Sequence, residues 1–458
     1  MKKTNRNSTL ITVFITLFIC IISARNSMAS TELKTIEKII THKTSIEKQA
    51  VGVSVVIING DKTEYLSLGL ADKKSKKKIN ANTLFEIGSV SKTFTALALA
   101  SMVKEGKIKL TDPVQNYLRE QVTLPVKNEK HITFLSLSNH SSGLPRLPTN
   151  MTFSNPLNPY ADYTVEMMYE FLNDYKLPRE VGEVHEYSNL AVGLLGHVLA
   201  LIDNKSYQDM ITDRVLNPLN MESTFVTIPA SKTGLMSDGH NGQLNVTQHW
   251  QLPTLAGAGA LNSSATDMAS YLKANMSKEQ LSGEFSLIHT STGLFGNPDT
   301  KIGLGWIILK GKDNQYYMHN GGTGGFRSFI AFDQKKQKGI VILTNSIFEL
   351  DEIGHAYINN QLDKVTLTTP VNVATETLDK LNGKFQLVPN FVLTITNDES
   401  QLYAQATGQQ KLTLTAISKT KFVNQAVKAR IIFEVNEEGE ATSLTMYQGG
   451  QTLPGVKL

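Results

Sequence analysis

The order of strand-like and helix-like segments is the feature that most constrains the fold of this chain. Two strand-like runs, Val51–Ile58 and Glu64–Ala71, are separated by a turn-forming Asn-Gly-Asp sequence, which predicts a β-hairpin. From residue 132 to 202 the apolar pattern is mainly helical. Beyond Gly303 its period changes from helical to two.

This period-two region predicts an antiparallel meander. Its strand-like segments are Leu304–Leu309, Gln315–His319, Phe326–Phe332 and Gly339–Thr344. Strands therefore lie at both ends of the segment 45–360, with helices between them. We expect one α/β domain, an antiparallel sheet with flanking helices and a helical region, whose sheet is built from both ends of the segment.

The C-terminal part of the chain has a different pattern. Residues 364–377 (KVTLTTPVNVATET) are typical of a linker, and the part that follows contains only short strand-like segments separated by polar turns. These segments are Leu387–Thr396, Gln401–Ala406, Lys411–Ile417, Ile431–Val435 and Ser443–Tyr447. We expect one large domain over 30–363 and a separate small all-β domain, a barrel or sandwich, over 378–458.

Residues 1–29 are typical of a secretory signal peptide. A basic start (MKKTNR) precedes the apolar run Leu10–Ile22, and Ser27 and Ala29 place small residues at the −3 and −1 positions of a cleavage site. An uncleaved membrane anchor is the alternative, although the apolar run is shorter than the ~20 residues that span a bilayer. Cleavage after Ala29 would also remove Cys20, the only cysteine. We expect a periplasmic or secreted protein with no stable membrane span after cleavage.

The charge distribution excludes little except a nucleic-acid partner. A net charge of +4 over 458 residues is small, and it gives no indication of nucleic-acid binding. The basic cluster Lys73–Lys78 lies between strand-like segments, where an exposed hairpin or loop explains it better than a binding patch. The sequence indicates no cofactor and no metal site, and it leaves the oligomeric state open.

The segment Phe85–Lys107 contains the first candidate catalytic pair. It turns at Gly88 and continues as a helix with an apolar face, and Ser89 lies at the helix start, where a hydroxyl can cap it. Lys92 lies one helical turn later, and a desolvated Lys beside a Ser can activate it as a nucleophile. Ser-x-x-Lys also occurs at five other places. Only this one follows a glycine turn and opens an apolar helix; the alternative is a capping Ser with a surface Lys.

Tyr187 and Asn189 form a second candidate pair, directly before the apolar segment Leu190–Ile202, which predicts a buried helix. A Tyr beside a Lys can relay a proton, and an Asn amide can hold a substrate carbonyl. The alternative is a tyrosine that packs by its ring at a helix entry, with Asn189 as the helix cap.

A third cluster, residues 319–325 (HNGGTGG), begins with His319 at the end of a strand-like segment. Its four glycines would let a substrate approach the strand backbone and let backbone N–H groups face an oxyanion. A glycine-rich β-turn is the alternative, although a hairpin turn needs only one or two glycines. A phosphate-binding loop is excluded, because no Lys-Ser/Thr or helix follows.

In this order, the three clusters resemble the penicillin-recognising serine hydrolases, and within them the class C β-lactamase and DD-peptidase branch. The similarity extends to the segments TLFEIGSVSKTFTA, LTDPVQNYL, LSNHSSGLP, YSNLAVGLLG, PLNMESTF, GLGW and HNGGTGGFRS. It covers roughly residues 40–350. The C-terminal part is similar to the lipocalin-like β domain that is appended to some members.

The resemblance implies a role for each residue of the three motifs. Ser89 would be the nucleophile that forms an acyl-enzyme, and Lys92 and Tyr187 would take its proton and pass it to the leaving group. Asn189 would orient the substrate amide. In the third motif, His319 and Gly321 would bind substrate, and the backbone N–H groups of Ser89 and Gly322 would form the oxyanion hole.

His319 departs from the class C pattern, in which a Lys within Lys-Thr-Gly attracts the substrate carboxylate. A His is only partly charged near neutral pH, so affinity for a carboxylate should fall as pH rises through the imidazole pKa. A His at this place resembles the DD-peptidases, D-amino-acid peptidases and esterases of the family. Leu147 falls about where class C enzymes offer a polar amide.

Three functions are therefore expected as alternatives. The first is a secreted class C-type β-lactamase that hydrolyses β-lactam amide bonds. The second is a D-Ala-D-Ala carboxypeptidase, D-peptidase or esterase of the same family. The third is a non-catalytic binding protein in which the β domain is the working part. In the first two the partner is a small-molecule or cell-wall peptide substrate.

Overall fold

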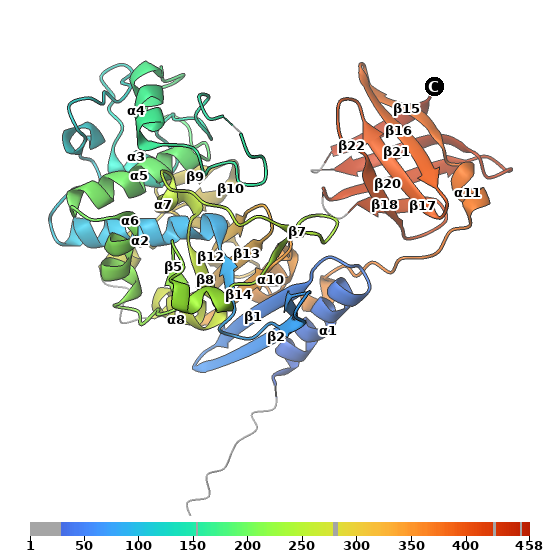
Figure 1. Ribbon diagram of the computed structural model, residues 1–458, viewed down its shortest axis with the longest axis horizontal. Coiled ribbons are helices and arrows are strands. Elements are labelled where there is room, and N and C mark those ends of the chain that lie inside the picture. Colours follow the sequence, from blue (N-terminus) through green and yellow to red (C-terminus); the bar gives the residue numbers. More distant parts are fainter. Residues whose placement is uncertain (1–28, 153, 278–282, 425–426, 449–450) are drawn as a thin grey trace, which may run out of the picture.

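A computed structural model describes residues 29–152, 154–277, 283–424, 427–448 and 451–458 (Figure 1). Apart from Ala29, the predicted signal peptide lies outside these residues. The chain forms a larger body of sheet and helices, followed by a β-barrel (Figure 1). Within the described ranges, no helix is both long and apolar enough to cross a bilayer.

A nine-stranded sheet forms the centre of the larger body. Its order is β3-β2-β1-β14-β13-β12-β11-β10-β9, so the N-terminal hairpin pairs with the last strand of the meander. That pairing is antiparallel, with Val53 opposite Thr344 and Asn59 opposite Lys338. The prediction that the two ends of one segment build a single sheet is confirmed. The strands are β1 (Gly52–Asn59), β2 (Lys62–Asp72), β3 (Lys77–Lys78), β9 (Gly293–Phe295), β10 (Asn297–Ile302), β11 (Ile307–Lys310), β12 (Gln315–Gly322), β13 (Arg327–Asp333) and β14 (Lys338–Thr344).

Two strands at one end of the sheet were not expected from the sequence. β9 and β10 extend the sheet beyond the predicted meander, and most of their side chains are exposed, so they lack the apolar alternation that reveals a buried strand. The next strand begins at Ile307, later than predicted. Residues 303–306 form a turn instead, closed by a 2.8 Å hydrogen bond from Gly303 N to the Trp306 carbonyl oxygen.

Helices cover both faces of the sheet (Figure 1). Val53, Val55 and Ile57 of β1 pack on one face with helices α1 (Thr31–Ser45) and α10 (Asp351–Ile358). Val56 and Ile58 point to the opposite core, with α2 (Ser91–Lys104) and α8 (Ala265–Met276). Because side chains alternate along a strand, a strand buried on both faces needs a nearly continuous apolar sequence. The sequence of β1, GVSVVIIN, meets this requirement.

The helices and small strands of the larger body complete the fold around α2. The helices are α1 (Thr31–Ser45), α2 (Ser91–Lys104), α3 (Phe134–Ser138), α4 (Val165–Asp174), α5 (Asn189–Ile202), α6 (Tyr207–Ile211), α7 (Ala256–Gly259), α8 (Ala265–Met276), α9 (Glu284–His289) and α10 (Asp351–Ile358). The small strands are β4 (Leu84–Glu86), β5 (Thr224–Phe225) and β8 (Asn262–Ser264) in one sheet, and β6 (Gly239–His240) and β7 (Val246–Thr247) in another.

Helix α2 is buried on nearly all sides rather than on the single apolar face that its pattern predicts. The threonines on its other face lie in the core because their hydroxyls find internal acceptors. Thr93 Oγ1 donates to the Val90 carbonyl oxygen at 2.8 Å, and Thr95 Oγ1 donates to that of Gly257 at 2.8 Å. A side chain in the first turn of α2 is therefore shielded from solvent from all directions.

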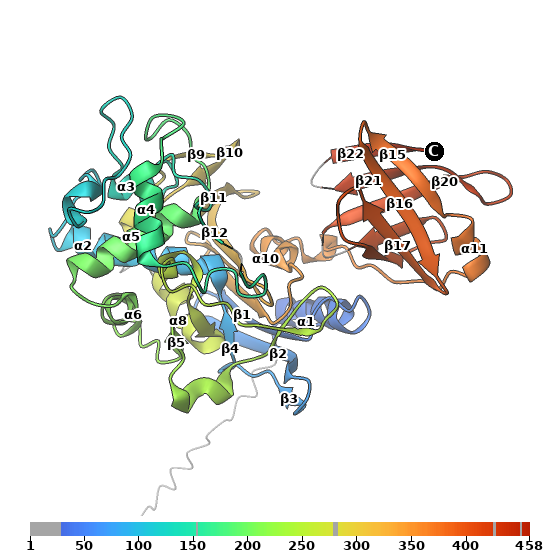
Figure 2. The ribbon, with the colours of Figure 1, turned by 45° about the horizontal axis from the view of Figure 1, so that its top comes forward.

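Residues 383–457 form a closed, all-antiparallel barrel of eight strands (Figure 2). The strands are β15 (Gly383–Val388), β16 (Phe391–Asp398), β17 (Gln401–Ala406), β18 (Leu412–Ala416), β19 (Lys421–Asn424), β20 (Ala429–Val435), β21 (Ala441–Gln448) and β22 (Gln451–Lys457), and the short helix α11 (Thr375–Asp379) precedes them. The predicted all-β domain is confirmed. Apolar side chains that include Phe385, Phe422 and Phe433 pack its interior.

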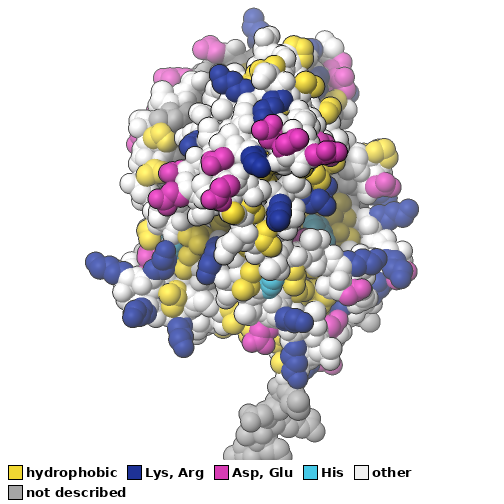
Figure 3. Space-filling view, turned by 90° about the vertical axis from the view of Figure 1, so that its right-hand side faces the viewer, with side chains coloured by type: hydrophobic (Ala, Val, Ile, Leu, Met, Phe, Trp, Pro, Cys, Tyr) yellow, Lys and Arg dark blue, Asp and Glu magenta, His cyan; other side chains and the backbone are white. Residues whose placement is uncertain are grey.

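The surface of the molecule carries both signs of charge. In the view from the barrel side, Lys and Arg side chains occur together with Asp and Glu side chains on the same face (Figure 3). This mixture agrees with the small net charge of +4.

Candidate active site

Ser89 lies on a short 3-10 turn between β4 and α2. Gly88 begins this turn with a φ of +49°, which glycine adopts without steric cost. A Cβ at Gly88 would lie 2.7 Å from the backbone nitrogen of Gly322, so β12 packs directly against the turn. The expectation that the Ser89 hydroxyl caps the helix is wrong: the N-cap of α2 is Val90, with no side-chain capping bond.

The Ser89 hydroxyl is instead a partner of Lys92. The Lys92 Nζ atom lies 3.0 Å from Ser89 Oγ and 2.6 Å from the Ala258 carbonyl oxygen, and the side chain is fully buried. Burial, together with the nearby charge of Arg146, holds the Lys92 pKa well below its ordinary value. A lysine that deprotonates readily has a free lone pair, which can accept the proton of the adjacent hydroxyl.

Tyr187 lies on the other side of the same pair. The Lys92 Nζ atom lies 4.9 Å from the centre of the Tyr187 ring, and Tyr187 lines the same cavity as Ser89. Burial raises the Tyr187 pKa to about 12, so the phenol keeps its proton at neutral pH. The ring packs against the ring of His140 in a tilted arrangement, with a centroid distance of 4.6 Å. Tyr187 is therefore a fixed proton donor next to the nucleophile.

Asn189 is the first residue of α5, but it is not the helix cap. Ser188 caps the helix, since its Oγ accepts from the Ala191 N–H at 2.9 Å. The Asn189 Nδ2 group donates to the Tyr160 hydroxyl at 3.4 Å, and its Oδ1 atom is buried without a hydrogen-bond partner among the described residues. An amide N–H of a substrate is the kind of donor that would satisfy this oxygen.

His319 is more deeply buried than the sequence indicated. Its side chain lies at the end of β12 with only 2% of the residue exposed. Nδ1 lies 2.6 Å from the Asn320 carbonyl oxygen and must donate to it, because a carbonyl only accepts. Burial and the Lys92 charge lower the His319 pKa to about 3. The expectation of a partly charged imidazole that attracts carboxylates near neutral pH is therefore wrong.

The glycine cluster allows close packing of the protein against itself. A Cβ on Gly321 would lie 2.0 Å from the Ile87 carbonyl oxygen, and one on Gly322 would lie 2.7 Å from a guanidinium nitrogen of Arg327. A Cβ on Gly324 would lie 2.5 Å from Trp250 Nε1. We expected these glycines to make room for a substrate. Instead, the space left by the missing side chains is filled by the turn that carries Ser89, by Arg327 and by Trp250.

Most of the predicted site residues border one cavity of about 420 Å³. Ser89, Tyr187, Gly321 and Gly322 line it. Lys92, Asn189 and His319 are not among the described residues that line it; Lys92 and His319 are buried behind the wall. The sequence assigned no role to the remaining lining residues, of which Asn320 and Thr323 belong to the third cluster: Arg146, Trp250, Ile307, Asn320, Thr323, Arg327 and Glu349.

Arg146 is the residue that the loop after HSSGLP presents to the cavity. Its guanidinium carbon lies 5.1 Å from the centre of the Tyr187 ring. Leu147, which we expected at this place, packs against the hydrophobic core instead. The cation Arg146 therefore occupies the place where the sequence predicted the apolar side chain of Leu147, which is the next residue along the loop.

Arg327 is the second cation of the cavity wall. Its Nη1 atom donates to the carbonyl oxygens of Thr323 at 3.0 Å and Phe326 at 2.9 Å. Burial lowers the Arg327 pKa, and the nearby carboxylates of Glu349 and Asp351 oppose this shift. Arg327 belongs to the segment HNGGTGGFRS, so the sequence placed it near the third motif. The sequence did not indicate that its side chain faces the cavity.

The barrel also contributes a charge near this wall. Lys428, in the connection between β19 and β20, forms an ion pair with Glu349 of the cavity lining. Burial raises the pKa of Asp351 in α10 and Lys428 opposes this rise, whereas burial lowers the pKa of His355 in the same helix and Lys428 adds to this fall. With Glu349 engaged by Lys428, less of its negative charge offsets Arg327.

Affinity for an anionic substrate should fall as pH rises through about 6, because burial raises the Asp351 pKa to about 6. Below that pH Asp351 is neutral; above it, its negative charge weakens the attraction that Arg327 exerts on an anion. We would measure KM for a carboxylate-bearing substrate from about pH 5 to 8. Asp351→Asn should flatten the profile and His319→Gln should not; the reverse result would assign the effect to His319.

Comparison with known proteins adds family information to this geometry. A family model described as "Beta-lactamase" matches residues 31–361, and a model described as "Domain of unknown function (DUF3471)" matches residues 368–455. A curated protein named "Beta-lactamase" from Pseudomonas fluorescens is 28% identical over 334 residues, which covers 65% of this chain and 89% of that protein. A second relative, named "D-alanyl-D-alanine-carboxypeptidase/endopeptidase AmpH" from Escherichia coli strain K12, is 26% identical over 316 residues, 65% of this chain and 80% of that protein.

A solved structure titled "A class C beta-lactamase" has the same fold. It superimposes with a TM-score of 0.63, covers 73% of this chain and 96% of its own, and is 24% identical. The expected fold of the larger body is confirmed by this match.

Proposed function

The chain belongs to the beta-lactamase family and is a serine hydrolase, and we propose that it is a secreted class C-type β-lactamase acting through Ser89. The observation that carries this proposal is the buried Lys92 Nζ atom 3.0 Å from Ser89 Oγ. A lysine in that position has few structural uses, because a buried charge without a carboxylate partner destabilises the fold. It is well suited to act as a base.

In the acylation step, Ser89 Oγ attacks the carbonyl carbon of the β-lactam while its proton passes to Lys92. The backbone N–H groups of Ser89 and Gly322 stabilise the oxyanion that forms. The C–N bond of the lactam then breaks. The leaving nitrogen takes a proton that Tyr187 donates, and Tyr187 is reprotonated from Lys92. The product is an ester between Ser89 and the substrate acyl group.

In the deacylation step, a water molecule attacks the ester carbonyl carbon. Lys92, neutral again after acylation, is the base for this step: it takes a proton from the Tyr187 hydroxyl while Tyr187 takes the proton of the water. The bond between the acyl carbon and Ser89 Oγ breaks, and the serine oxygen recovers its proton. Asn189 supports both steps by holding the amide of the substrate side chain with its Oδ1 atom, for which the described part of the chain offers no hydrogen-bond donor.

Export is part of the proposal, with cleavage after Ala29 and a periplasmic or extracellular location. Its basis is the basic start, apolar run and small residues of the first 29 positions. The surroundings of Ser30 are compatible with cleavage after Ala29. Ser30 N lies 2.8 Å from Glu64 Oε1, so a new α-ammonium group at Ser30 would meet a carboxylate.

A D-Ala-D-Ala carboxypeptidase or esterase is the second candidate. It is favoured by His319, which stands where class C enzymes have a Lys and which is buried and uncharged. The same acyl-enzyme chemistry applies, with a D-alanine amine or an alcohol as the leaving group. The two candidates differ in the rate of deacylation after a β-lactam has reacted.

The test is a comparison of three substrates with the mature chain from Ser30. Nitrocefin, a D-Ala-D-Ala peptide and a p-nitrophenyl ester would be followed to steady state, and penicillin-treated protein would be analysed by peptide mass spectrometry. We expect a penicilloyl adduct on the Ser89 peptide and continuous nitrocefin turnover. Ser89→Ala is the control and should show neither.

Each other outcome decides against part of the proposal. A stable adduct without nitrocefin turnover, together with release of D-alanine, would assign a penicillin-inhibited peptidase. Ester hydrolysis without any penicilloyl adduct would assign an esterase. Activity that persists in Ser89→Ala would exclude Ser89 as the nucleophile.

A further inference from the structure

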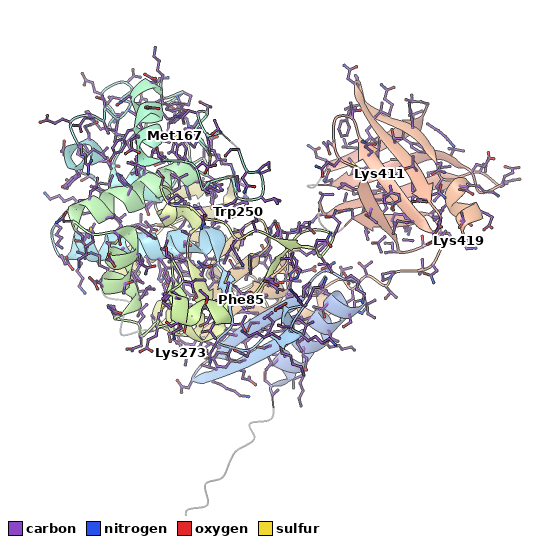
Figure 4. All side chains as sticks on the ribbon, viewed as in Figure 1. Phe85, Met167, Trp250, Lys273, Lys411 and Lys419 are labelled. Carbon is purple, nitrogen blue, oxygen red and sulfur yellow. The ribbon has the colours of Figure 1, made fainter. Side chains whose placement is uncertain are left out.

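A second cavity, of about 660 Å³, lies beside the catalytic one. Trp250 lines both cavities and so forms part of the wall between them. Figure 4 shows Trp250 between the helical region, marked by Met167, and the part of the chain that carries Phe85. A group attached to a substrate at Ser89 would need only to pass Trp250 to enter the second cavity.

Glu86 is the unusual residue of this second cavity. It ends strand β4, three residues before Ser89, and its side chain is only 5% exposed. Its Oε1 atom accepts hydrogen bonds from His249 Nδ1 at 2.9 Å and from the Trp250 backbone N–H at 3.0 Å. Its Oε2 atom is buried and has no hydrogen-bond partner among the described residues. A buried carboxylate oxygen without a donor is costly, which indicates that a donor comes from outside.

The rest of the cavity wall indicates what kind of donor this is. A second carboxylate, Asp238, lines the cavity, and none of the described lining residues is a Lys or Arg. Apolar side chains, which include Val226, Ile228 and Leu252, form much of the remaining wall. An alkyl chain with a terminal ammonium group matches both features, because its methylenes cover apolar surface and its head pairs with a carboxylate.

We propose that this cavity is a subsite for a primary alkylammonium group on the acyl part of the substrate, with Glu86 as its specificity-determining residue. The inference rests on the proposed function, since it names the substrate class of the same serine. The alternative for Glu86 is purely structural, namely that its two hydrogen bonds fix the loop that carries His249 and Trp250. The two roles differ in what they predict for substrate preference.

The experiment compares two chromogenic esters with the same six-carbon chain, the p-nitrophenyl esters of aminohexanoate, whose terminal group is a cation, and of acetamidohexanoate, whose terminal amide is neutral. We expect kcat/KM to be at least about tenfold higher for the amino ester, which is the range of a charge-assisted hydrogen bond. Free hexylamine should compete with the amino ester more strongly than with the neutral one. If it inhibits both equally, the cavity binds a separate amine and not the substrate chain, which overturns the proposal.

Three variants test Glu86 against the structural alternative. Glu86→Gln keeps an acceptor oxygen for His249 and Trp250 and should lower the preference for the amino ester to near unity. Thr227→Lys places an ammonium at an exposed position on the cavity wall and should have the same effect without disturbing the core. Glu284→Gln removes one negative charge outside both cavities and should leave the preference unchanged.

Failure of the subsite and failure of the proposed function give different results. Equal kcat/KM for the two esters, or a preference that survives both Glu86→Gln and Thr227→Lys, overturns the subsite and leaves Ser89 as the nucleophile. An equal fall for both esters in Glu86→Gln assigns the structural role. If neither ester is hydrolysed, calorimetry with hexylamine on the wild type and Glu86→Gln decides: binding lost in the variant supports the subsite, and no binding overturns it.

Discussion

Replacing Lys92 with methionine should lower the rate constant for acylation by about 10²- to 10⁴-fold, the usual contribution of a positioned general base. Methionine keeps an unbranched side chain in the buried space but has no lone pair that can take the Ser89 proton. The distance of 3.0 Å between Lys92 Nζ and Ser89 Oγ makes direct transfer possible in the wild type. Stopped-flow acylation by nitrocefin or a fluorescent penicillin would measure the effect.

Two further variants separate proton transfer from simple attraction of charge. Lys92→Arg retains a cation that does not deprotonate, so it should be about as slow as Lys92→Met if a neutral amine is required. The double variant of Ser89→Ala and Lys92→Met should be no slower than Ser89→Ala alone, because residues that act as a unit are not additive. Near-normal acylation in Lys92→Arg, with an unchanged unfolding temperature, would contradict the role of Lys92 as base.

The fold was predictable because its evidence lies in long periodic segments. The apolar run of β1 and the alternation in the meander reveal strands, and α5 is apolar nearly all round. Strands β9 and β10 were missed because strands with mostly exposed side chains carry no such pattern. The short turn at residues 303–306 likewise displaced the start of β11 from its predicted position.

The candidate site was predictable as a set of residues but less so as an electrostatic arrangement. Six Ser-x-x-Lys pairs occur in the chain, and the order of three motifs selected Ser89 and Lys92. Whether a titratable group is charged depends on burial by residues far away in sequence. For this reason the prediction that His319 is partly charged near neutral pH was wrong. Arg146 was missed because a one-residue difference along a loop decides which side chain faces the cavity.

The charges in the catalytic cavity change which residues we expect to attract a substrate carboxylate. With His319 uncharged, Arg146 and Arg327 are the only Lys or Arg residues among the described lining of the catalytic cavity. A carboxylate in that cavity would meet guanidinium groups, which can donate two parallel hydrogen bonds. Arg327 uses only Nη1 for the hydrogen bonds found to the Thr323 and Phe326 carbonyl oxygens, so other donors are left for an anion.

Arg327→Ala should therefore lower kcat/KM for a carboxylate-bearing substrate by about 10- to 100-fold, the range of a charge-assisted hydrogen bond. The matched substrate is the same penicillin as its methyl ester, for which the fall should be smaller than about threefold, because no anion is lost. Most of the effect should appear in KM, since the arginine binds the substrate in its ground state as well as in the transition state.

Arg327→Lys and Arg146→Ala complete the argument. Arg327→Lys keeps the charge but loses the paired geometry, so it should lie between the wild type and Arg327→Ala. If Arg146 attracts the same carboxylate, Arg146→Ala should show the same preference for the methyl ester; if it serves only to depress the Lys92 pKa, it should slow both substrates equally. Equal losses on acid and ester in both alanine variants would show that neither arginine recognises a carboxylate, and the family's usual charge attraction would then be absent from this protein.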